Sequence, residues 1–132
     1  MQQIYVAHSR KFDYKKELYV PLRNANLNHQ YTIILPHETD DFINSKEIIK
    51  QSHFVIAEVS FPSLGEGVEL GWADSFNIPI ICIYRKGNKP SGSLKTLTKT
   101  IIPYSSATDM ISKLENFLSA ATKITPSMLI KI

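Results

Sequence analysis

The most constraining feature of this chain is an apolar run that breaks into small residues and then becomes helical. Residues 54–59 are apolar and β-branched apart from Glu58, which is typical of a strand buried on both faces of a parallel sheet. Small residues dominate the loop at 60–67, and a helix is predicted at 67–76. This order of elements presents backbone N–H groups to anionic ligands in α/β proteins.

Length and composition indicate one globular domain. A chain of 132 residues can bury a sizeable core, and we expect a domain at residues 1–121 followed by a tail at 122–132. With 43% hydrophobic and 20% charged residues, the composition excludes a disordered protein. The net charge of +3 comes from scattered basic residues. This excludes a nucleic-acid-binding stripe and suits a small anionic ligand.

Cysteine and histidine usage bounds the chemistry. Cys82 is the only cysteine, which excludes an intrachain disulfide and a cysteine-based zinc site, and it is expected to be a buried small hydrophobe. No histidine pair has metal-ligand spacing, so we expect neither a metal nor a cofactor. The N-terminus lacks the features of a signal peptide, and no apolar run approaches membrane-spanning length. A cytoplasmic protein without membrane contact is therefore predicted.

Strand and helix patterns alternate along the chain. Further strands are predicted at 4–7, 31–35, 78–84 and 100–104, and further helices at 13–27, at 45–51, from 93 and at 106–121. Pro21 should kink the first helix or start a second one. Asn44 or Ser45, and Ser106, are expected helix N-caps. The alternation predicts a single α/β domain with a doubly wound, flavodoxin- or Rossmann-like parallel sheet of about five strands.

Polar residues follow four of the predicted strands. They are His8, Ser9 and Arg10, then His37 and Glu38, then Ser60, Ser63, Gly65 and Gly67, and finally Arg85 and Lys86. In open parallel sheets ligands bind beyond the carboxyl ends of the strands. Since these groups suit anions, the sequence predicts a phosphate or sugar site at that edge.

The glycines of the loop do not complete a known nucleotide fingerprint. Gly65 and Gly67 begin a dinucleotide pattern, but its third glycine is due at Leu70, and Gly71 comes one place late. Nicotinamide binding is therefore disfavoured. No Gly-Lys-Ser or Gly-Lys-Thr occurs, which excludes a Walker loop.

Three glutamates of this region have different expected roles. Glu69, expected in the first helical turn, either stabilises the helix dipole or acts chemically, and spacing alone does not separate the two. Glu66 either flanks the same cleft or is a solvated loop charge, and the second interpretation is favoured. Glu58, on an otherwise apolar strand, is predicted to be a buried acceptor for nearby donors. Trp72 and Phe76, four apart, are expected in the core or at a subunit contact.

The loop and its flanks resemble a known family. Residues 57–73 read Ala-Glu-Val-Ser-Phe-Pro-Ser-Leu-Gly-Glu-Gly-Val-Glu-Leu-Gly-Trp-Ala, which is similar to the signature of the nucleoside 2-deoxyribosyltransferase superfamily. The similarity is greatest to the branch of small 2′-deoxynucleoside 5′-monophosphate N-glycosidases. Tyr5 and Ser9 fit the same pattern, and the resemblance extends over about residues 3–105.

The resemblance implies an activity and a set of site residues. Glu69 matches the glutamate that attacks the anomeric carbon and forms a glycosyl-enzyme ester, and Ser63, with the amides of Gly65 and Gly67, matches the pocket for the 5′ end. For the phosphate the matching residues are Ser9 and Arg10. The branch forms homodimers in which a serine of the neighbouring subunit completes the pocket, and Ser93 is the counterpart. Trp72, Phe76 and residues 86–96 should then contribute to the dimer interface.

The chain departs from the family at three positions. An aspartate that positions or protonates the nucleobase is Ser45 here, a second aspartate is His53, and the glycine before Ser9 is His8. The proton for the departing base must then come from His8, His37 or a water. Two hypotheses follow: an N-glycosidase or deoxyribosyltransferase acting on nucleosides or nucleotides, or a non-catalytic nucleotide-binding or signalling domain.

Overall fold

The structure, a computed structural model, describes residues 1–122 and contains one sheet of five parallel strands. The strands are β1 (Gln3–His8), β2 (Thr32–Ile34), β3 (Phe54–Glu58), β4 (Ile80–Arg85) and β5 (Ile101–Tyr104). Their order across the sheet is β2-β1-β3-β4-β5. The predicted α/β class with a parallel sheet of about five strands is confirmed.

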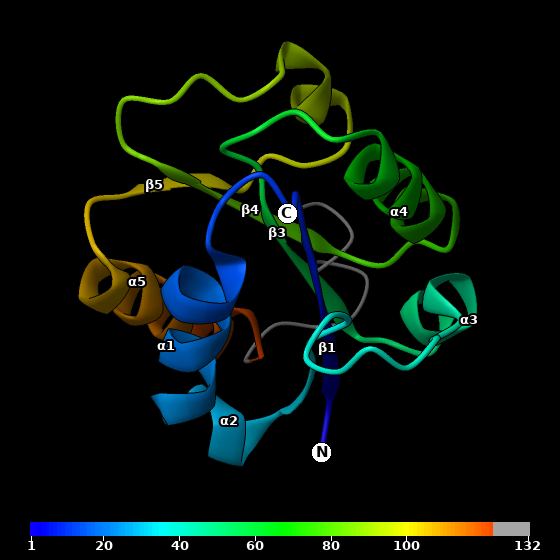
Figure 1. Cartoon of the computed structure of the whole chain (residues 1–132), viewed down its shortest axis with the longest axis horizontal. Helices are drawn as coiled ribbons and strands as arrows, with labels where there is room; N and C mark the ends of the chain where they lie inside the picture. Colours follow the sequence, from blue (N-terminus) through cyan, green and yellow to red (C-terminus); the bar gives the residue numbers. More distant parts are fainter. Residues whose placement is uncertain (123–132) are drawn as a thin grey trace.

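Helices cover both faces of the sheet (Figure 1). They are the π-helical turn η1 (Lys15–Tyr19), α1 (Val20–Asn24), α2 (Leu27–Gln30), α3 (Ser45–Lys50), α4 (Leu64–Ser75), the 3-10 turn η2 (Gly92–Thr96) and α5 (Ala107–Ala121). On one face lie α1, α2 and α5, and on the other lie α3 and α4. Apart from Thr122, the expected tail lies outside the described residues. Among residues 1–122, no helix combines the length and apolarity needed to cross a membrane.

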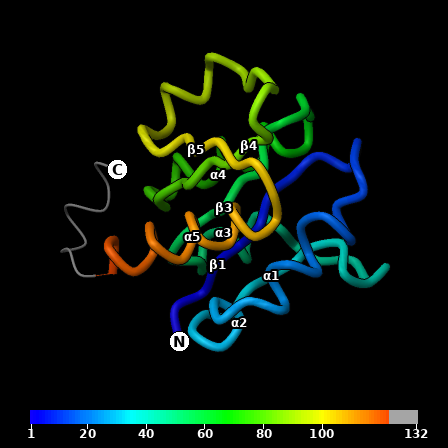
Figure 2. Tube along the Cα trace, turned by 90° about the vertical axis from the view of Figure 1, so that its left-hand side faces the viewer, coloured from blue at the N-terminus to red at the C-terminus, as the bar shows by residue number. Residues whose placement is uncertain are grey.

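The core consists of two layers, one on each side of the sheet, because successive strand side chains point to opposite faces. Ile4 and Val6 pack toward α1 and α5, whereas Tyr5 and Ala7 pack toward α3 and α4. The segment between β4 and β5, which carries η2, lies at one end of the molecule, and α2 lies at the other (Figure 2). The predicted burial of Cys82 is confirmed.

One helix prediction is confirmed in one of its two forms and one needs correction. The stretch expected to be helical at 13–27 holds two consecutive segments, η1 and α1, and Pro21 stands in the first turn of the second, as predicted, where its missing N–H costs nothing. The helix after the loop begins at Leu64 rather than at Gly67, because the Ser63 hydroxyl accepts a hydrogen bond from the Glu66 N–H and caps it. Glu69 therefore lies in the second turn, where the helix dipole has little effect.

The strand order places a topological switch point between β1 and β3. From β1 the chain moves outward to β2 and then returns to the other side of β1, so the connections after β1 and β3 diverge. His8 and Glu58 are paired in register at this edge. Glu58 accepts hydrogen bonds from the backbone and hydroxyl of Ser60 at 2.7 and 3.0 Å and from the hydroxyl of Tyr104. Its predicted role as a buried acceptor is confirmed.

Candidate active site

A cleft of about 870 Å³ opens beyond the carboxyl ends of β1 and β3. It brings together seven of the ten predicted site residues: His8, Ser9, Arg10, His37, Ser63, Gly65 and Glu69. They come from the loops after β1 and β2 and from the start of α4. The prediction that Glu69 lies near Ser9 and Ser63 at one edge of the sheet is confirmed by this arrangement.

Glu69 is half-buried and is held by a side chain from the sheet. The Tyr5 hydroxyl donates to Glu69 Oε2 and lies 3.1 Å from Ser45 Oγ. Burial raises the pKa of the Glu69 carboxyl, and hydrogen bonds from Tyr5 and Ser45 act in the opposite direction. The carboxylate is thus partly desolvated but kept ionisable, which is the state required of a nucleophile.

His8 is buried at the floor of the cleft in a defined tautomer. Its Nδ1 lies 2.8 Å from the carbonyl oxygen of Ser9 and must donate to it, so Nε2 accepts from the Tyr19 hydroxyl at 2.7 Å. Tyr19 in turn accepts from the backbone N–H of His37 at 3.0 Å. Burial, with smaller contributions from His37 and Arg10 nearby, lowers the pKa of His8 to about 4. At neutral pH, His8 is an uncharged structural group.

The cleft contains groups suited to an anion beside its carboxylates. Arg10, Lys11 and Lys46 line it, and the Ser9 hydroxyl accepts from the backbone N–H of Lys11 at 3.0 Å. A Cβ added at Gly65 would meet no atom within 4 Å, so a ligand can approach the backbone at the start of α4 closely. Cationic side chains, hydroxyls and a helix N-terminus are the recurring components of phosphate sites.

Two charged groups expected at this edge, Arg85 and Glu38, follow their strands but do not line the cleft. Arg85 pairs with Glu17 at 2.9 Å, and its guanidinium lies 5.1 and 5.2 Å from the ring centres of Phe12 and Phe61. These contacts bind the loops after β1 and β3 together behind the cleft. Glu38 pairs with Arg23 at 2.8 Å at the protein surface.

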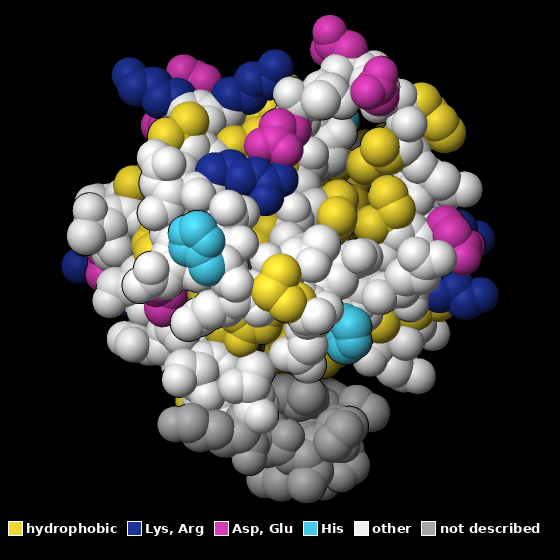
Figure 3. All heavy atoms as spheres, turned by 90° about the horizontal axis from the view of Figure 1, so that it is seen from below, with side chains coloured by type: hydrophobic (Ala, Val, Ile, Leu, Met, Phe, Trp, Pro, Cys, Tyr) yellow, Lys and Arg dark blue, Asp and Glu magenta, His cyan; other side chains and the backbone are white. Residues whose placement is uncertain are grey.

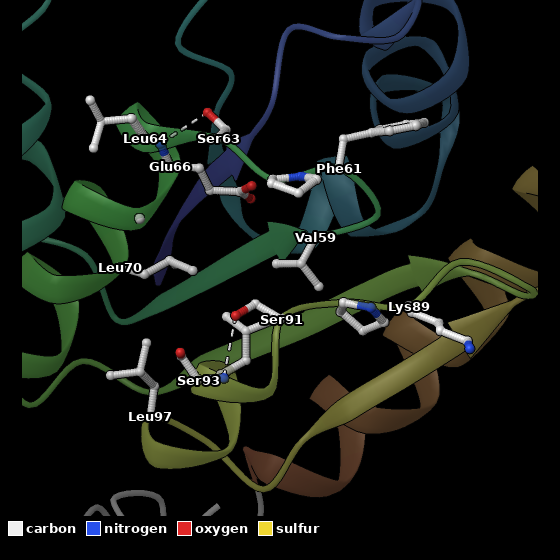
Figure 4. Close-up of a pocket in the computed structure, with 14 residues that line it drawn as sticks. Val59, Phe61, Ser63, Leu64, Glu66, Leu70, Lys89, Ser91, Ser93 and Leu97 are labelled. Atoms are coloured by element: carbon white, nitrogen blue, oxygen red, sulfur yellow. Dashed lines mark hydrogen bonds between the residues drawn. The ribbon is translucent and has the colours of Figure 1, made fainter.

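A second cavity, of about 420 Å³, lies on the other side of the start of α4 (Figure 4). Gly67 and Ser93 line this cavity and not the cleft, so the structure does not bring these two predicted residues to Glu69 within one chain. Tyr5, the remaining predicted residue, is fully buried beneath Glu69.

The structure contradicts the interpretation of Glu66 as a solvated loop charge. Only 5% of its surface is exposed, since it points inward from the first turn of α4 toward the sheet and the segment carrying η2. Burial, together with the charges of Glu58 and Glu69, raises its pKa to about 9. Its Oε2 has no hydrogen-bond partner among the described residues.

Sequence reasoning also missed Lys46 and Trp72 as residues of the cleft. The Lys46 ammonium lies 5.8 Å from the Trp72 ring centre, so α3 and α4 form one wall together. The adjacency of Lys46 to Ser45 was the available signal.

Within the described part of the chain, no three His, Cys, Asp or Glu side chains are grouped as a metal site requires. On the face seen from below, basic and acidic side chains are interspersed (Figure 3).

Comparison with known proteins connects this geometry to nucleotide chemistry. No protein-family model matches the chain. A 48-residue segment is 44% identical to mouse 5-hydroxymethyl-dUMP N-hydrolase, covering 35% of this chain and 28% of the relative. A 51-residue segment is 47% identical to the human protein of that name, covering 39% and 26%. A putative 2′-deoxynucleoside 5′-phosphate N-hydrolase of Syntrophotalea carbinolica is 44% identical over 39 residues, covering 30% and 28%.

The similarity of the fold extends over most of the chain. Clostridium botulinum CMP N-glycosidase superposes with a TM-score of 0.67 at 18% identity, covering 88% of this chain and 99% of that one. A conserved Enterococcus faecalis protein gives a TM-score of 0.58 at 17% identity, covering 89% and 99%. The matched segments span less than a third of the curated relatives. The chain therefore shares its fold with CMP N-glycosidase, and the resemblance to nucleotide N-hydrolases expected from its Gly-x-Gly-x-Glu loop is confirmed.

Proposed function

We propose that this protein cleaves the N-glycosidic bond of a nucleoside 5′-monophosphate through Glu69. The observation that carries the proposal is a partly desolvated carboxylate, oriented by Tyr5, in a cleft that also holds Ser9, Arg10 and Ser63. The names of the relatives, which are N-hydrolases of nucleotides, support the same reaction class. The substrate is a small molecule, and no metal or other cofactor enters the reaction.

The proposed reaction proceeds in two steps. A Glu69 carboxylate oxygen attacks C1′ of the sugar, while the bond from C1′ to the base nitrogen breaks and its electron pair leaves with the base. Water then attacks C1′ of the glycosyl ester, releasing the sugar phosphate and the free Glu69 carboxylate. If a second base replaces this water, the outcome is transfer of the sugar instead of hydrolysis.

The positive side of the cleft would bind the phosphate. Arg10 offers a guanidinium, and Ser9, Ser63 and the amides near Gly65 offer hydrogen bonds. Burial already raises the pKa of Glu69, and a phosphate beside it would disfavour its ionised form further, so the anionic phosphate should bind next to the cations rather than next to this carboxylate. This separation orients the sugar with C1′ toward Glu69.

The second candidate function is nucleotide binding without cleavage. It is favoured by Ser45, which stands where the related enzymes carry an aspartate and whose hydroxyl lies beside Tyr5. A serine cannot supply an acidic proton to a departing base. In this alternative the cleft would recognise a nucleotide and Glu69 would only shape its wall.

Incubation with a panel of nucleosides and nucleoside 5′-monophosphates, including CMP and 5-hydroxymethyl-dUMP, tests the proposal. Free base is measured by chromatography. Glu69→Gln should abolish base release and leave nucleotide binding intact, because the amide has the shape of the carboxylate but is no nucleophile. Glu115→Gln, which changes a carboxylate on α5 across the sheet, is the matched control. A nucleotide that raises the melting temperature without being cleaved would favour the binding alternative.

A further inference from the structure

Glu66 occupies the wall between the two cavities, one helical turn before Glu69. It lines both the cleft and the second cavity, and Figure 4 shows its side chain extending from α4 over Val59, with Ser91 and Ser93 on the opposite side. A buried carboxyl group whose Oε2 has no partner among the described residues is costly to retain without a function.

Burial and the charges around Glu66 keep it protonated. Glu58 at the end of β3 and Glu69 on α4 both disfavour its ionisation, and Cys82 on β4 is close enough for its own pKa to be raised by Glu66. Lys89, in the loop after β4, also lines the second cavity, and Figure 4 shows its ammonium directed away from Glu66. Glu66 is thus a neutral carboxylic acid at pH 7, with a proton to donate.

The other groups near Glu69 have no proton available. The Tyr5 proton is directed at Glu69, and burial raises the pKa of Tyr5 above its usual range. The only ring proton of His8 is donated to the carbonyl oxygen of Ser9. His37 has its pKa lowered, chiefly by burial, so it is uncharged at neutral pH. Among the described residues lining the cleft, Glu66 is the acid whose proton is not already donated to another group.

We propose that Glu66 is the general acid of the proposed reaction, donating its proton to the nucleobase as Glu69 attacks C1′. This inference rests on the proposed function. The carboxyl O–H bond of Glu66 breaks, and the proton joins the base nitrogen whose electron pair came from the glycosidic bond. Glu66 becomes a carboxylate, and it takes a proton back from the water that later attacks C1′ of the ester.

The position of Glu66 beside the nucleophile couples the two events. Before attack, the negative charge of Glu69 holds the proton on Glu66. Formation of the glycosyl ester removes that charge, so Glu66 becomes more acidic at the moment when the base needs a proton. Two carboxyl groups with opposed protonation states are also how glycoside hydrolases divide these tasks.

The experiment compares substrates whose leaving groups differ in their need for a proton. CMP and 5-hydroxymethyl-dUMP release bases that are poor leaving groups, whereas 4-nitrophenyl 2-deoxyriboside 5-phosphate releases a phenolate that leaves without protonation. Glu66→Gln should lower kcat on the nucleotides by about 10²–10⁴-fold, and it should lower kcat on the nitrophenyl compound far less. The wild type should lose kcat at alkaline pH, because Glu66 ionises there. Glu66→Gln should not show this loss. Glu115→Gln should change neither kcat nor its dependence on pH.

The outcomes separate this inference from the proposed function. Equal losses of kcat on the nucleotides and on the nitrophenyl compound would indicate that Glu66 has a structural role. This outcome would overturn the inference. Full nucleotide cleavage by Glu66→Gln, with none by Glu69→Gln, would also overturn it and leave the proposed function standing. If the wild type cleaves no compound of the three, the proposed function and this inference fail together. A cooperative thermal unfolding transition of Glu66→Gln, at or above the wild-type melting temperature, confirms that the variant is folded.

Discussion

Tyr5 and Glu69 are 64 positions apart and meet in a hydrogen bond from the phenol to the carboxylate at the floor of the cleft. Tyr5 is on β1, an interior strand of the sheet, and Glu69 is on α4, so the contact fixes the carboxylate relative to the sheet. Because the hydroxyl stabilises the ionised form, it also lowers the pKa of Glu69 against the effect of burial.

Tyr5→Phe should therefore raise the pKa of Glu69. Loss of a hydrogen bond to a charged group, about 1.5–3 kcal/mol, corresponds to a rise of about one to two pH units. Since Glu69 must be ionised to attack, the acidic limb of the kcat–pH profile moves to higher pH. Tyr31→Phe, a buried tyrosine packed against the helices on the opposite face, is the control. An unchanged acidic limb in Tyr5→Phe would contradict the role given to this bond.

Ser63→Ala tests the start of α4 in two ways. The hydroxyl caps the helix by accepting from the Glu66 N–H at 3.4 Å, and its loss should destabilise the protein by about 0.5–2 kcal/mol. If the hydroxyl also binds the phosphate, nucleotide affinity should fall by a further 1–3 kcal/mol, on the order of 5–150-fold. Calorimetry of nucleotide binding and thermal unfolding measures the two effects.

Ser106→Ala separates these effects, because Ser106 caps α5 in the same manner, accepting from the Asp109 N–H at 3.0 Å. This variant should lose comparable stability and bind nucleotide normally. Equal affinity in the two variants would show that Ser63 is only a cap.

Glu66→Gln should change how stability depends on pH. The folded pKa of Glu66, about 9, is above its ordinary value of 4.5, so the stabilising protonated state is fully favourable below pH 4.5 and is lost as the pH rises to 9. At pH 7 the free energy of unfolding of the wild type should be about 3 kcal/mol lower than at pH 4.5 because of this group. Glutamine does not titrate, so the unfolding free energy of the variant should fall less between pH 5 and 9. Parallel curves for the two proteins would place the Glu66 carboxyl in water.

The homodimer expected from the resemblance remains a prediction, and the surface of α4 supplies a way to test it. Leu64 is 88% exposed and Val68 is 44% exposed, and both line the cleft on the same helix as Trp72. Leu64→Lys should convert a dimer into a monomer by light scattering, whereas Val20→Lys, at a 53% exposed residue on α1, should not. A wild type that is monomeric at micromolar concentration would refute the dimer.

Much of the fold was predictable because the signals are local. The buried strand at Phe54–Glu58 and the caps at Asn44 and Ser106 follow from patterns within a few residues, and the structure confirms them. The start of α4 was mispredicted because Gly65 and Gly67 suggested a loop. The cap at Ser63 and packing against the sheet outweigh their low helix propensity.

The sequence by itself determined the order of strands and helices, the polar character of the carboxyl edge and the candidacy of Glu69, since these depend on hydrophobic period and on a short motif. Only the tertiary structure decided the protonation of the site. Glu66 and Glu69 are chemically identical and three positions apart. Glu66 is enclosed against the sheet and its Oε2 has no partner among residues 1–122, whereas Glu69 receives a bond from Tyr5. A pKa depends on what surrounds a group in space, and those surroundings come from β1, β3 and β4, which are distant in the chain.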